Sequence, residues 1–302
     1  MDLGFPKRKL KSTDMVDYGL EFCARNLVRI ILVMLFLHIP VKFVTSFLLS
    51  GYSLVNALSD VEYSRTLLGT IVRFAAGLIV YSAYNTLLYP ALKMGIIRFC
   101  YRKITLGEDR TPKEIFKDGF RHLGWYLLYT LLLGAALGTV CYVFYFIEII
   151  ILLLSSVVPA WVVVAIMAVL GLGLLGLVTY FALRLSFVDF EIALKCRNPF
   201  SAIKYSFKMT KTNERLVLYT CFWRVIIGEM IPFTISALSS WISMSSVSAM
   251  SVVSAVLSSV GTIAVPVGLA IGTVLFIKCE EDSGDAGSEL KFVEFFEERG
   301  AL

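Results

Sequence analysis

Long apolar runs alternate with shorter, charge-rich segments along the whole chain. Each run is at least as long as the about 20 residues that an α-helix needs to cross the hydrocarbon core of a bilayer. The pattern predicts an all-α, polytopic membrane protein with six transmembrane helices, over residues 28–49, 67–88, 124–146, 158–185, 216–237 and 252–277. Pro40, Pro232 and Pro266 lie well inside three of these runs, and we expect kinks there.

The composition excludes a water-soluble globule. Hydrophobic residues make up 58% of the chain and charged residues 17%, whereas a soluble domain has about 45–50% apolar and about 25% charged residues. The excess apolar surface needs a lipid environment.

Lysine and arginine set the expected orientation, because short cytoplasmic loops retain them. Of the 28 basic residues, all but Lys42, Arg65, Arg73 and Arg224 lie before or at the start of the first run, follow the sixth, or lie in 93–121 and 184–215. We therefore expect a multi-pass protein of the plasma (inner) membrane with both termini in the cytoplasm. The basic N-terminus lies too far from the first run for a secretory signal, so we expect an uncleaved chain.

Three shorter segments, 12–26, 111–120 and 198–211, show helical patterning of their own. Thr111, Pro112 and Glu114 form a typical helix start, since threonine caps a free N–H and glutamate reaches back to another. The candidates for the N-cap of the first segment are Ser12, Thr13 and Asp14.

Each segment is expected to gather apolar residues on one face: Val16, Leu20, Cys23 and Leu27; Ile115, Phe116 and Phe120; Phe200, Ile203 and Phe207. Lysines line neighbouring faces of the second and third segments: Lys113, Lys117, Lys204, Lys208 and Lys211. Basic helices of this kind lie in the headgroup region and attract anionic lipids. These cytoplasmic, amphipathic interfacial helices are therefore expected to contact anionic lipid headgroups or a membrane-protein partner, or else to serve as connectors packed under the bundle.

Each of these helices precedes a pair of apolar runs, so the six-span membrane domain (1–278) has three possible units, 12–90, 111–185 and 198–278. Residues 279–302 form an acidic cytoplasmic tail. The tail is expected either to be solvated or to fold back on the basic helices.

The segments RKITLGE (102–108), TPKEIFKDGF (111–120) and NPFSAIKYSFKMTK (198–211) resemble the YciC-like family of bacterial membrane proteins. Sequences related to that family form the membrane domain attached to some glycerophosphodiester phosphodiesterases. The resemblance implies a six-helix integral membrane protein and supplies no catalytic residues. The phosphodiesterase domain itself needs paired histidines and metal-binding carboxylates on a barrel of about 250 residues, and the sequence contains no such domain.

Lys42, Arg73 and Glu229 fall inside predicted spans, where ionisable side chains are costly and usually face the bundle interior. At about 1.5 Å per residue, Lys42 and Arg73 lie roughly 10 Å from the outer ends of their spans, and Glu229 lies in the middle or outer half of its own. We expect them to meet. They either line a water-accessible cavity that binds an anionic group or form a structural ion cluster.

Candidate catalytic and metal-binding groups are scarce. His38 and His122 are the two histidines, and neither has a ligand spacing with cysteines. The GLGLLG run (171–176) lies inside a span instead of following a strand. Its glycines, like Gly134 and Gly138, are expected to permit close helix contact. We expect no cofactor, no metal ion and no nucleic-acid partner.

Two functions stay open at this stage. The first is a non-enzymatic envelope or lipid-associated accessory or scaffold protein that acts through the basic cytoplasmic helices. The alternative is a transporter or channel for a small anionic solute or lipid headgroup, using Lys42, Arg73 and Glu229.

Overall fold

The computed structural model describes residues 11–34, 40–41, 44, 64–121, 123–154, 159–195, 197–243 and 264–282. These residues are helical apart from short connections, and none of them lies in a β-strand. The all-α class is therefore confirmed. Most of the first predicted span, the first half of the sixth, both histidines and most of the acidic tail lie outside the described residues.

The chain divides into two compact units. One comprises Met1–Leu123 and Thr212–Leu302, and the other Gly124–Lys211. The three consecutive units expected from the sequence, 12–90, 111–185 and 198–278, stay a prediction.

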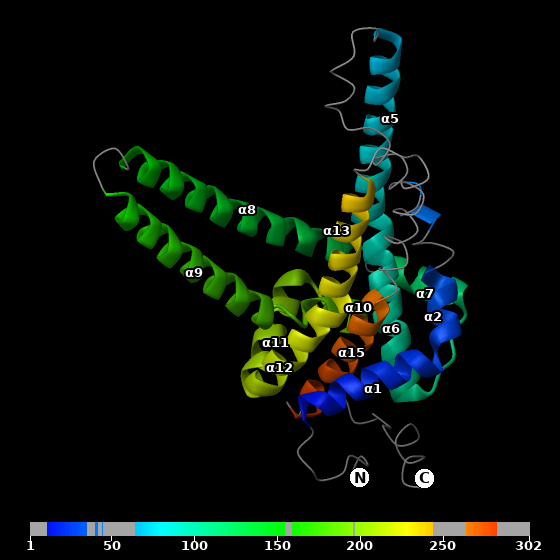
Figure 1. Cartoon of the computed structure of the whole chain (residues 1–302). Coiled ribbons are helices and arrows are strands. Elements are labelled where there is room, and N and C mark those ends of the chain that lie inside the picture. Colours follow the sequence, from blue (N-terminus) through cyan, green and yellow to red (C-terminus); the bar gives the residue numbers. More distant parts are fainter. Residues whose placement is uncertain are drawn as a thin grey trace. The chain divides into compact units, whose positions relative to one another are not determined.

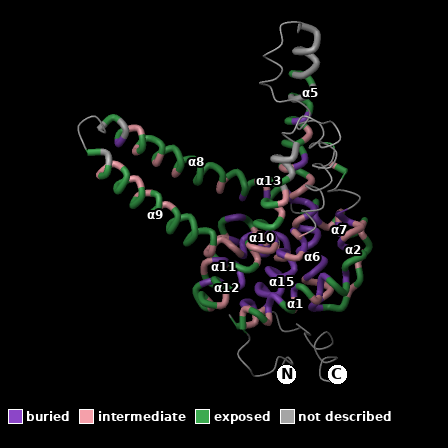
Figure 2. The backbone as a smooth tube through the Cα atoms, viewed as in Figure 1, coloured by how far each residue is buried: buried purple, intermediate pink, exposed green. Residues whose placement is uncertain are grey.

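The first unit is built around one central helix (Figure 1). Its elements are α1 (Ser12–Arg25), α2 (Leu27–Val33), α5 (Ser64–Ala83), η2 (Tyr84–Leu88), α6 (Tyr89–Leu106), α7 (Pro112–Phe120), α12 (Glu214–Val225), η3 (Ile226–Met230), α13 (Ile231–Ser243) and α15 (Ala264–Asp282). Helices α1, α6 and α12 and the π-helical segment η3 pack around α15. Consequently α15 is buried along most of its length (Figure 2).

Helix α1 packs on α15 through a face rotated from the expected one. Leu20 and Leu27 are 42% and 48% exposed, and the buried residues are Met15, Val16, Gly19, Phe22 and Cys23. At Gly19 an added Cβ would lie 2.8 Å from the Cα of Ile271. This close backbone approach sets the rotation of α1, which the spacing of large apolar residues does not reveal.

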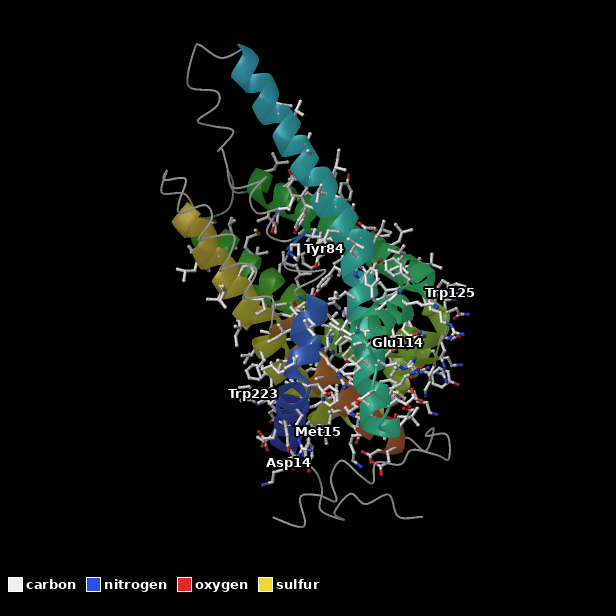
Figure 3. All side chains as sticks on the ribbon, turned by 90° about the vertical axis from the view of Figure 1, so that its right-hand side faces the viewer. Asp14, Met15, Tyr84, Glu114, Trp125 and Trp223 are labelled. Atoms are coloured by element: carbon white, nitrogen blue, oxygen red, sulfur yellow. The ribbon has the colours of Figure 1, made fainter. Side chains whose placement is uncertain are left out.

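The start of α1 also differs slightly from the prediction. The helix begins at Ser12, and Lys11 occupies the N-cap position. The backbone N–H of Lys11 donates to the Asp14 carboxylate at 2.8 Å. Asp14 therefore stabilises the helix start from the first turn, while the adjacent Met15 is fully buried (Figure 3).

Helices α6 and α7 form a tight pair. Helix α6 continues to Leu106, well past the predicted end of the second span, and Gly107 ends it in the left-handed conformation with φ +66°. An added Cβ at Gly119 would overlap the carbonyl oxygen of Ala91, and Arg98 donates to the Asp118 carbonyl at 3.0 Å. The two backbones thus approach too closely for any side chain at position 119.

The π-helical segments η2 and η3 interrupt long helices in the part of this unit that the structure describes. Segment η2 joins α5 to α6 and segment η3 joins α12 to α13, and a proline lies two residues after each, at Pro90 and Pro232. A proline ring crowds the carbonyl four residues earlier in an α-helix. In both cases that carbonyl lies within the π segment, whose wider turn accommodates the ring.

The second unit contains α8 (Leu123–Leu154), α9 (Ala160–Arg184), α10 (Val188–Lys195) and α11 (Pro199–Thr212). Helices α8 and α9 are the arms of a hairpin (Figure 1), as predicted for the third and fourth spans. Ser206 ties α11 to the end of α9, since its hydroxyl donates to the Arg184 carbonyl at 2.6 Å and accepts from the Phe187 N–H at 3.2 Å.

Three of the described helices are long and apolar enough to cross a membrane: Leu123–Ile151, Trp161–Lys195 and Glu214–Ile235. The first two are almost entirely unburied within the structure, as the exposed surface of α8 and α9 shows (Figure 2). A continuous apolar surface of this extent requires lipid contact. The protein is therefore a membrane protein.

The glycines of these two helices do not mediate close packing within the described structure. An added Cβ at Gly134, Gly138, Gly171, Gly173 or Gly176 would meet no heavy atom within 4 Å. The expectation of close helix contact at these positions is wrong for the described residues. The close approaches occur instead at glycines of the first unit, at Gly19, Gly95, Gly119, Gly228 and Gly268.

Candidate functional site

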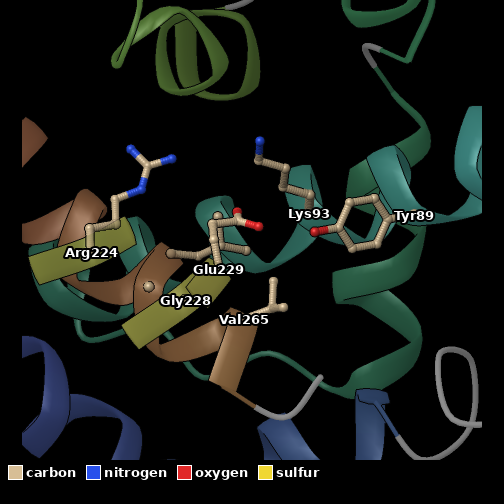
Figure 4. Close-up of a pocket in the computed structure, with 8 residues that line it drawn as sticks. Tyr89, Lys93, Arg224, Gly228, Glu229 and Val265 are labelled. Carbon is tan, nitrogen blue, oxygen red and sulfur yellow. The ribbon is translucent and has the colours of Figure 1, made fainter. Parts of the chain in front are cut away.

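A surface pocket in the first unit gathers ionisable side chains from three elements (Figure 4). It is a small depression with a volume of about 10 Å³, and it is lined by Tyr89, Lys93, Arg224, Gly228, Glu229, Val265, Gly268 and Leu269. Lys93 comes from α6, Arg224 and Glu229 from the α12–η3 helix, and the remaining wall from α15. Figure 4 shows the Glu229 carboxylate between the Arg224 and Lys93 side chains.

The π segment explains why Arg224 and Glu229 share this pocket. Residues five apart in a regular α-helix point about 140° apart around the axis. One extra residue in a π turn reduces that separation to about 40°. The same effect is visible across η2, where the rings of Tyr84 and Tyr89 lie 6.1 Å apart.

The floor of the pocket is a close crossing of η3 and α15. An added Cβ at Gly228 would lie 3.0 Å from the Cα of Gly268, and one at Gly268 would lie 2.9 Å from the Cα of Gly228. Both glycines are buried. This backbone contact fixes the position from which Glu229 projects.

The structure groups Glu229 with Lys93 and Arg224, whereas the sequence placed it with Lys42 and Arg73. Arg73 precedes Lys93 by twenty residues on the continuous α5–η2–α6 helix, a distance of about 30 Å along the axis. Lys42 and the Arg73 side chain lie outside the described residues.

Sequence reasoning missed Lys93 and Arg224 because it grouped charged residues by their depth in the predicted spans, which put Lys93 in a cytoplasmic segment and Arg224 near the cytoplasmic end of its span. Pro90 and Pro232 could have indicated the π turns from the sequence. Pro90 follows two tyrosines spaced five residues apart, Tyr84 and Tyr89, and Pro232 follows two oppositely charged residues with the same spacing, Arg224 and Glu229. Such a pair shares a face only if the turn before the proline widens.

The five lysines singled out by the sequence are all exposed. Lys113 and Lys117 lie on α7, and Lys204, Lys208 and Lys211 lie on α11. The two helices belong to different units. Each helix presents its lysines at the surface of its own unit.

The aromatic residues of α11 do not form its packing face. Phe200 is 69% exposed, and the buried positions are Pro199, Ala202, Ser206, Met209 and Thr210. Of the predicted stripe, Phe200 therefore faces outward, whereas Ile203 and Phe207 are half-buried. Small and polar residues suffice for packing because Ser206 anchors the helix to the end of α9 through hydrogen bonds.

Helix α7 repeats this arrangement in shorter form. Ile115 and Gly119 are buried, whereas Phe120 is 41% exposed and Phe116 is partly exposed. The rings of Phe116 and Phe120 contact each other edge to face at 4.8 Å between centroids. The outward face of α7 thus combines an aromatic pair with Lys113 and Lys117.

The loop between α6 and α7 holds an ion network that ties α2 to this helix pair. Asp109 accepts from Arg29, with Nη2 to Oδ2 at 3.0 Å, and pairs with Lys103. The hydrogen bonds from Arg29 and Lys103 lower the pKa of Asp109. Glu108 pairs with Arg110 at 2.9 Å, and its pKa is also lowered. We assign these loop charges a structural role.

None of the described cysteines forms a disulfide: Cys23, Cys100, Cys141, Cys221 and Cys279. Burial raises the pKa of Cys23 and of Cys279 to about 12, and it also raises the pKa of Cys100. These three side chains stay protonated at neutral pH and act as small apolar groups in the core.

Comparison of the chain with protein-family models, with curated proteins and with solved structures finds no match. Among the described residues, no three His, Cys, Asp or Glu side chains are grouped so as to hold a metal ion. Functional interpretation therefore depends on the pocket and on the outward faces of α7 and α11.

Proposed function

We propose that this chain is a non-enzymatic integral membrane protein that binds anionic lipid headgroups through α7 and α11. It has six spans and both termini in the cytoplasm of the plasma (inner) membrane, and it acts as an envelope or lipid-associated accessory or scaffold protein. The observation that carries the proposal is the outward face of α11, where exposed phenylalanine lies beside exposed lysines.

The helical wheel of α11 separates a packing face from an interfacial face. Taking about 100° per residue from Phe200, the lysines and Phe207 fall within about 80° of Phe200. Ala202, Ser206 and Met209 fall on the opposite side and are buried. If α11 served only to connect its neighbours, this buried side alone would be needed. Bulky aromatic residues on the other side are explained if that side enters the headgroup region.

The expected energy favours docking at an anionic surface. Each lysine near such a surface contributes about 1 kcal/mol, so Lys204, Lys208 and Lys211 together contribute about 3 kcal/mol. The phenylalanines add apolar burial at the acyl boundary. Helix α7, with Lys113 and Lys117, supplies a second and smaller contact. The resemblance to the YciC-like bacterial membrane proteins includes both segments, 111–120 and 198–211.

The proposal is tested on the full-length protein in nanodiscs of phosphatidylglycerol or of phosphatidylcholine, with hydrogen–deuterium exchange read over α11. We expect α11 to exchange more slowly in phosphatidylglycerol. Replacing Lys204, Lys208 and Lys211 with glutamine should remove that difference, and replacing the same three with arginine should preserve it. Equal exchange in both lipids for the unmodified protein, or an unchanged difference in the glutamine variant, would contradict the proposal.

A transporter or channel for a small anionic solute is the second candidate. It is favoured by one observation, the position of Glu229 in a pocket with two cations. Transport through the predicted site would require a water-filled path from this pocket to the level of Arg73, about 30 Å away along the helix axis.

A further inference from the structure

Helices α8 and α9 place exposed aromatic residues at two levels of their hairpin. On α8, Trp125 and Tyr145 are 44% and 60% exposed and lie twenty residues apart. On α9, Trp161 and Tyr180 are 74% and 49% exposed and lie nineteen residues apart. At about 1.5 Å per residue, each pair spans about 30 Å, which is the thickness of the hydrocarbon core of a bilayer. The two arms of the hairpin therefore give the same spacing independently.

The side chains between these two levels suit an apolar environment. Neither helix has a charged residue between its two exposed aromatic residues. The hydroxyls of Thr130, Thr139 and Thr179 donate to backbone carbonyls of their own helices, which satisfies them without water. Tyr142 is exposed as well, but it lies less than one turn before Tyr145 and belongs to the same level.

The charged residues of the two helices lie just beyond these levels. Glu148 follows Tyr145 by three residues, and Arg184 follows Tyr180 by four. Charged side chains at such positions reach the headgroup region, whereas the same side chains inside the hydrocarbon core are costly. The exposed aromatic residues and the charges thus mark the same two boundaries.

We propose that the hairpin crosses a bilayer with Trp125 and Tyr180 at one interface and Tyr145 and Trp161 at the other. Tryptophan and tyrosine are enriched at both interfaces of a membrane, because their rings are apolar and their N–H or O–H groups reach water. The charge-free surface between the two levels matches the uncharged acyl chains. The charges beyond the levels match the headgroups and the water.

The boundary at Tyr180 also sets the depth of α11. Arg184 lies about 6 Å beyond Tyr180 along the helix axis, and its carbonyl accepts a hydrogen bond from the Ser206 hydroxyl at 2.6 Å. The headgroup region is about 6 Å thick on each side, so Ser206 is held at headgroup level. The depth of α11 follows from the hairpin alone, whereas lipid contact of its lysines rests on the proposed function.

The test compares two positions on the same face of α8, on either side of Tyr145. Cys141 and Glu148 are seven residues apart, which is about two turns, and both are exposed. The unmodified protein and a Cys141→Ser, Glu148→Cys variant are reacted in nanodiscs with a charged maleimide, and mass spectrometry of peptides gives the rate at each position. Position 148 should react at least about tenfold faster, because the reactive thiolate is costly in the hydrocarbon core.

Equal rates at positions 141 and 148 would overturn the boundary at Tyr145. Leu172→Cys is the matched control within the core, since Leu172 is 69% exposed and lies between the two levels of α9. It should react as slowly as Cys141. Unfolding in denaturant should make all three positions react at similar rates, and a difference that persists there would trace to local chemistry and overturn the assignment. Thermal unfolding establishes that each variant is folded.

Tryptophan fluorescence gives a second measurement that needs no thiol. The protein keeps either Trp125 or Trp161, and its other tryptophans are changed to phenylalanine. Lipids spin-labelled near the headgroup should quench each of these tryptophans more than lipids labelled near the end of the acyl chain. Leu172→Trp in a tryptophan-free background should show the reverse order. Stronger quenching of Trp125 or Trp161 by the deep label would overturn the boundary at that residue.

Phe200→Trp in the same background separates this inference from the proposed function. Quenching at position 200 by phosphatidylglycerol labelled near the headgroup supports both. If position 200 is not quenched while positions 141 and 148 react as expected, the boundaries stand and the lipid contact of α11 fails. Equal reactivity at positions 141 and 148 overturns the boundaries, whatever position 200 shows.

Discussion

At the scale of single residues, the glycines that approach another backbone decide how the helices of the first unit pack. Gly119 lies against the Ala91 carbonyl, and Gly268 lies against Gly228. By contrast, Gly134 of α8 has no heavy atom near the position of an added Cβ. The same residue type is therefore essential in one place and replaceable in another.

We predict that Gly119→Ala destabilises the protein by about 3 kcal/mol, because the methyl group would overlap a backbone carbonyl that has no room to move. Gly134→Ala is the matched control and should be neutral or stabilising by up to about 1 kcal/mol, since alanine favours helix. Thermal unfolding of both variants in the same detergent measures the difference. A Gly119→Ala protein as stable as Gly134→Ala would show that α6 and α7 are not in close contact.

At the scale of elements, the start of α7 confirms the capping box read from Thr111 and Glu114. The Glu114 N–H donates to the Thr111 hydroxyl at 3.4 Å, and the Thr111 N–H donates to the Glu114 carboxylate at 2.9 Å. Hydrogen bonds from the Thr111 backbone and hydroxyl lower the pKa of Glu114 from its usual 4.5. The ionised carboxylate is thus the form that stabilises the helix start.

The lowered pKa has a definite consequence for stability. The contribution of Glu114 is present above about pH 4.5 and is lost as the pH falls through its lower folded pKa. Thermal unfolding should show Glu114→Gln less stable than the unmodified protein at pH 7, with the gap closing as the pH falls below 4. A stability difference between Glu114→Gln and the unmodified protein that is independent of pH would contradict the assigned role of the carboxylate. Separately, Thr111→Ala removes the N-cap and should lower the free energy of unfolding by about 1 kcal/mol.

At the scale of the whole molecule, three helices have the length and apolar character of membrane spans, and the remaining spans and the orientation stay predictions. The hairpin of α8 and α9 offers a direct test. Its connection includes Pro159, which is exposed, and Lys204 lies on α11 beyond the end of α9.

We expect an impermeant thiol reagent to label Pro159→Cys in intact cells, because the positive-inside rule places this connection outside. Lys204→Cys should be labelled only after the membrane is permeabilised. The unmodified protein, with its native cysteines, gives the background. Labelling of Lys204→Cys from outside would reverse the predicted orientation of the chain.

The sequence by itself determined the helical class, the membrane location and the start of α7, because composition, run length and capping chemistry depend on residues close together in the chain. The tertiary structure alone decided which face of each helix is buried. Gly19 sets the buried face of α1 through close contact with the Ile271 backbone, and the hydrogen bonds of Ser206 to the end of α9 set the buried face of α11. It also decided the composition of the pocket, since a π turn before Pro232 aligned Arg224 with Glu229 and the packing of α6 on α15 brought Lys93 beside them. Periodicity assumes a regular helix, and the residues that break the regularity here act through contacts far apart in sequence.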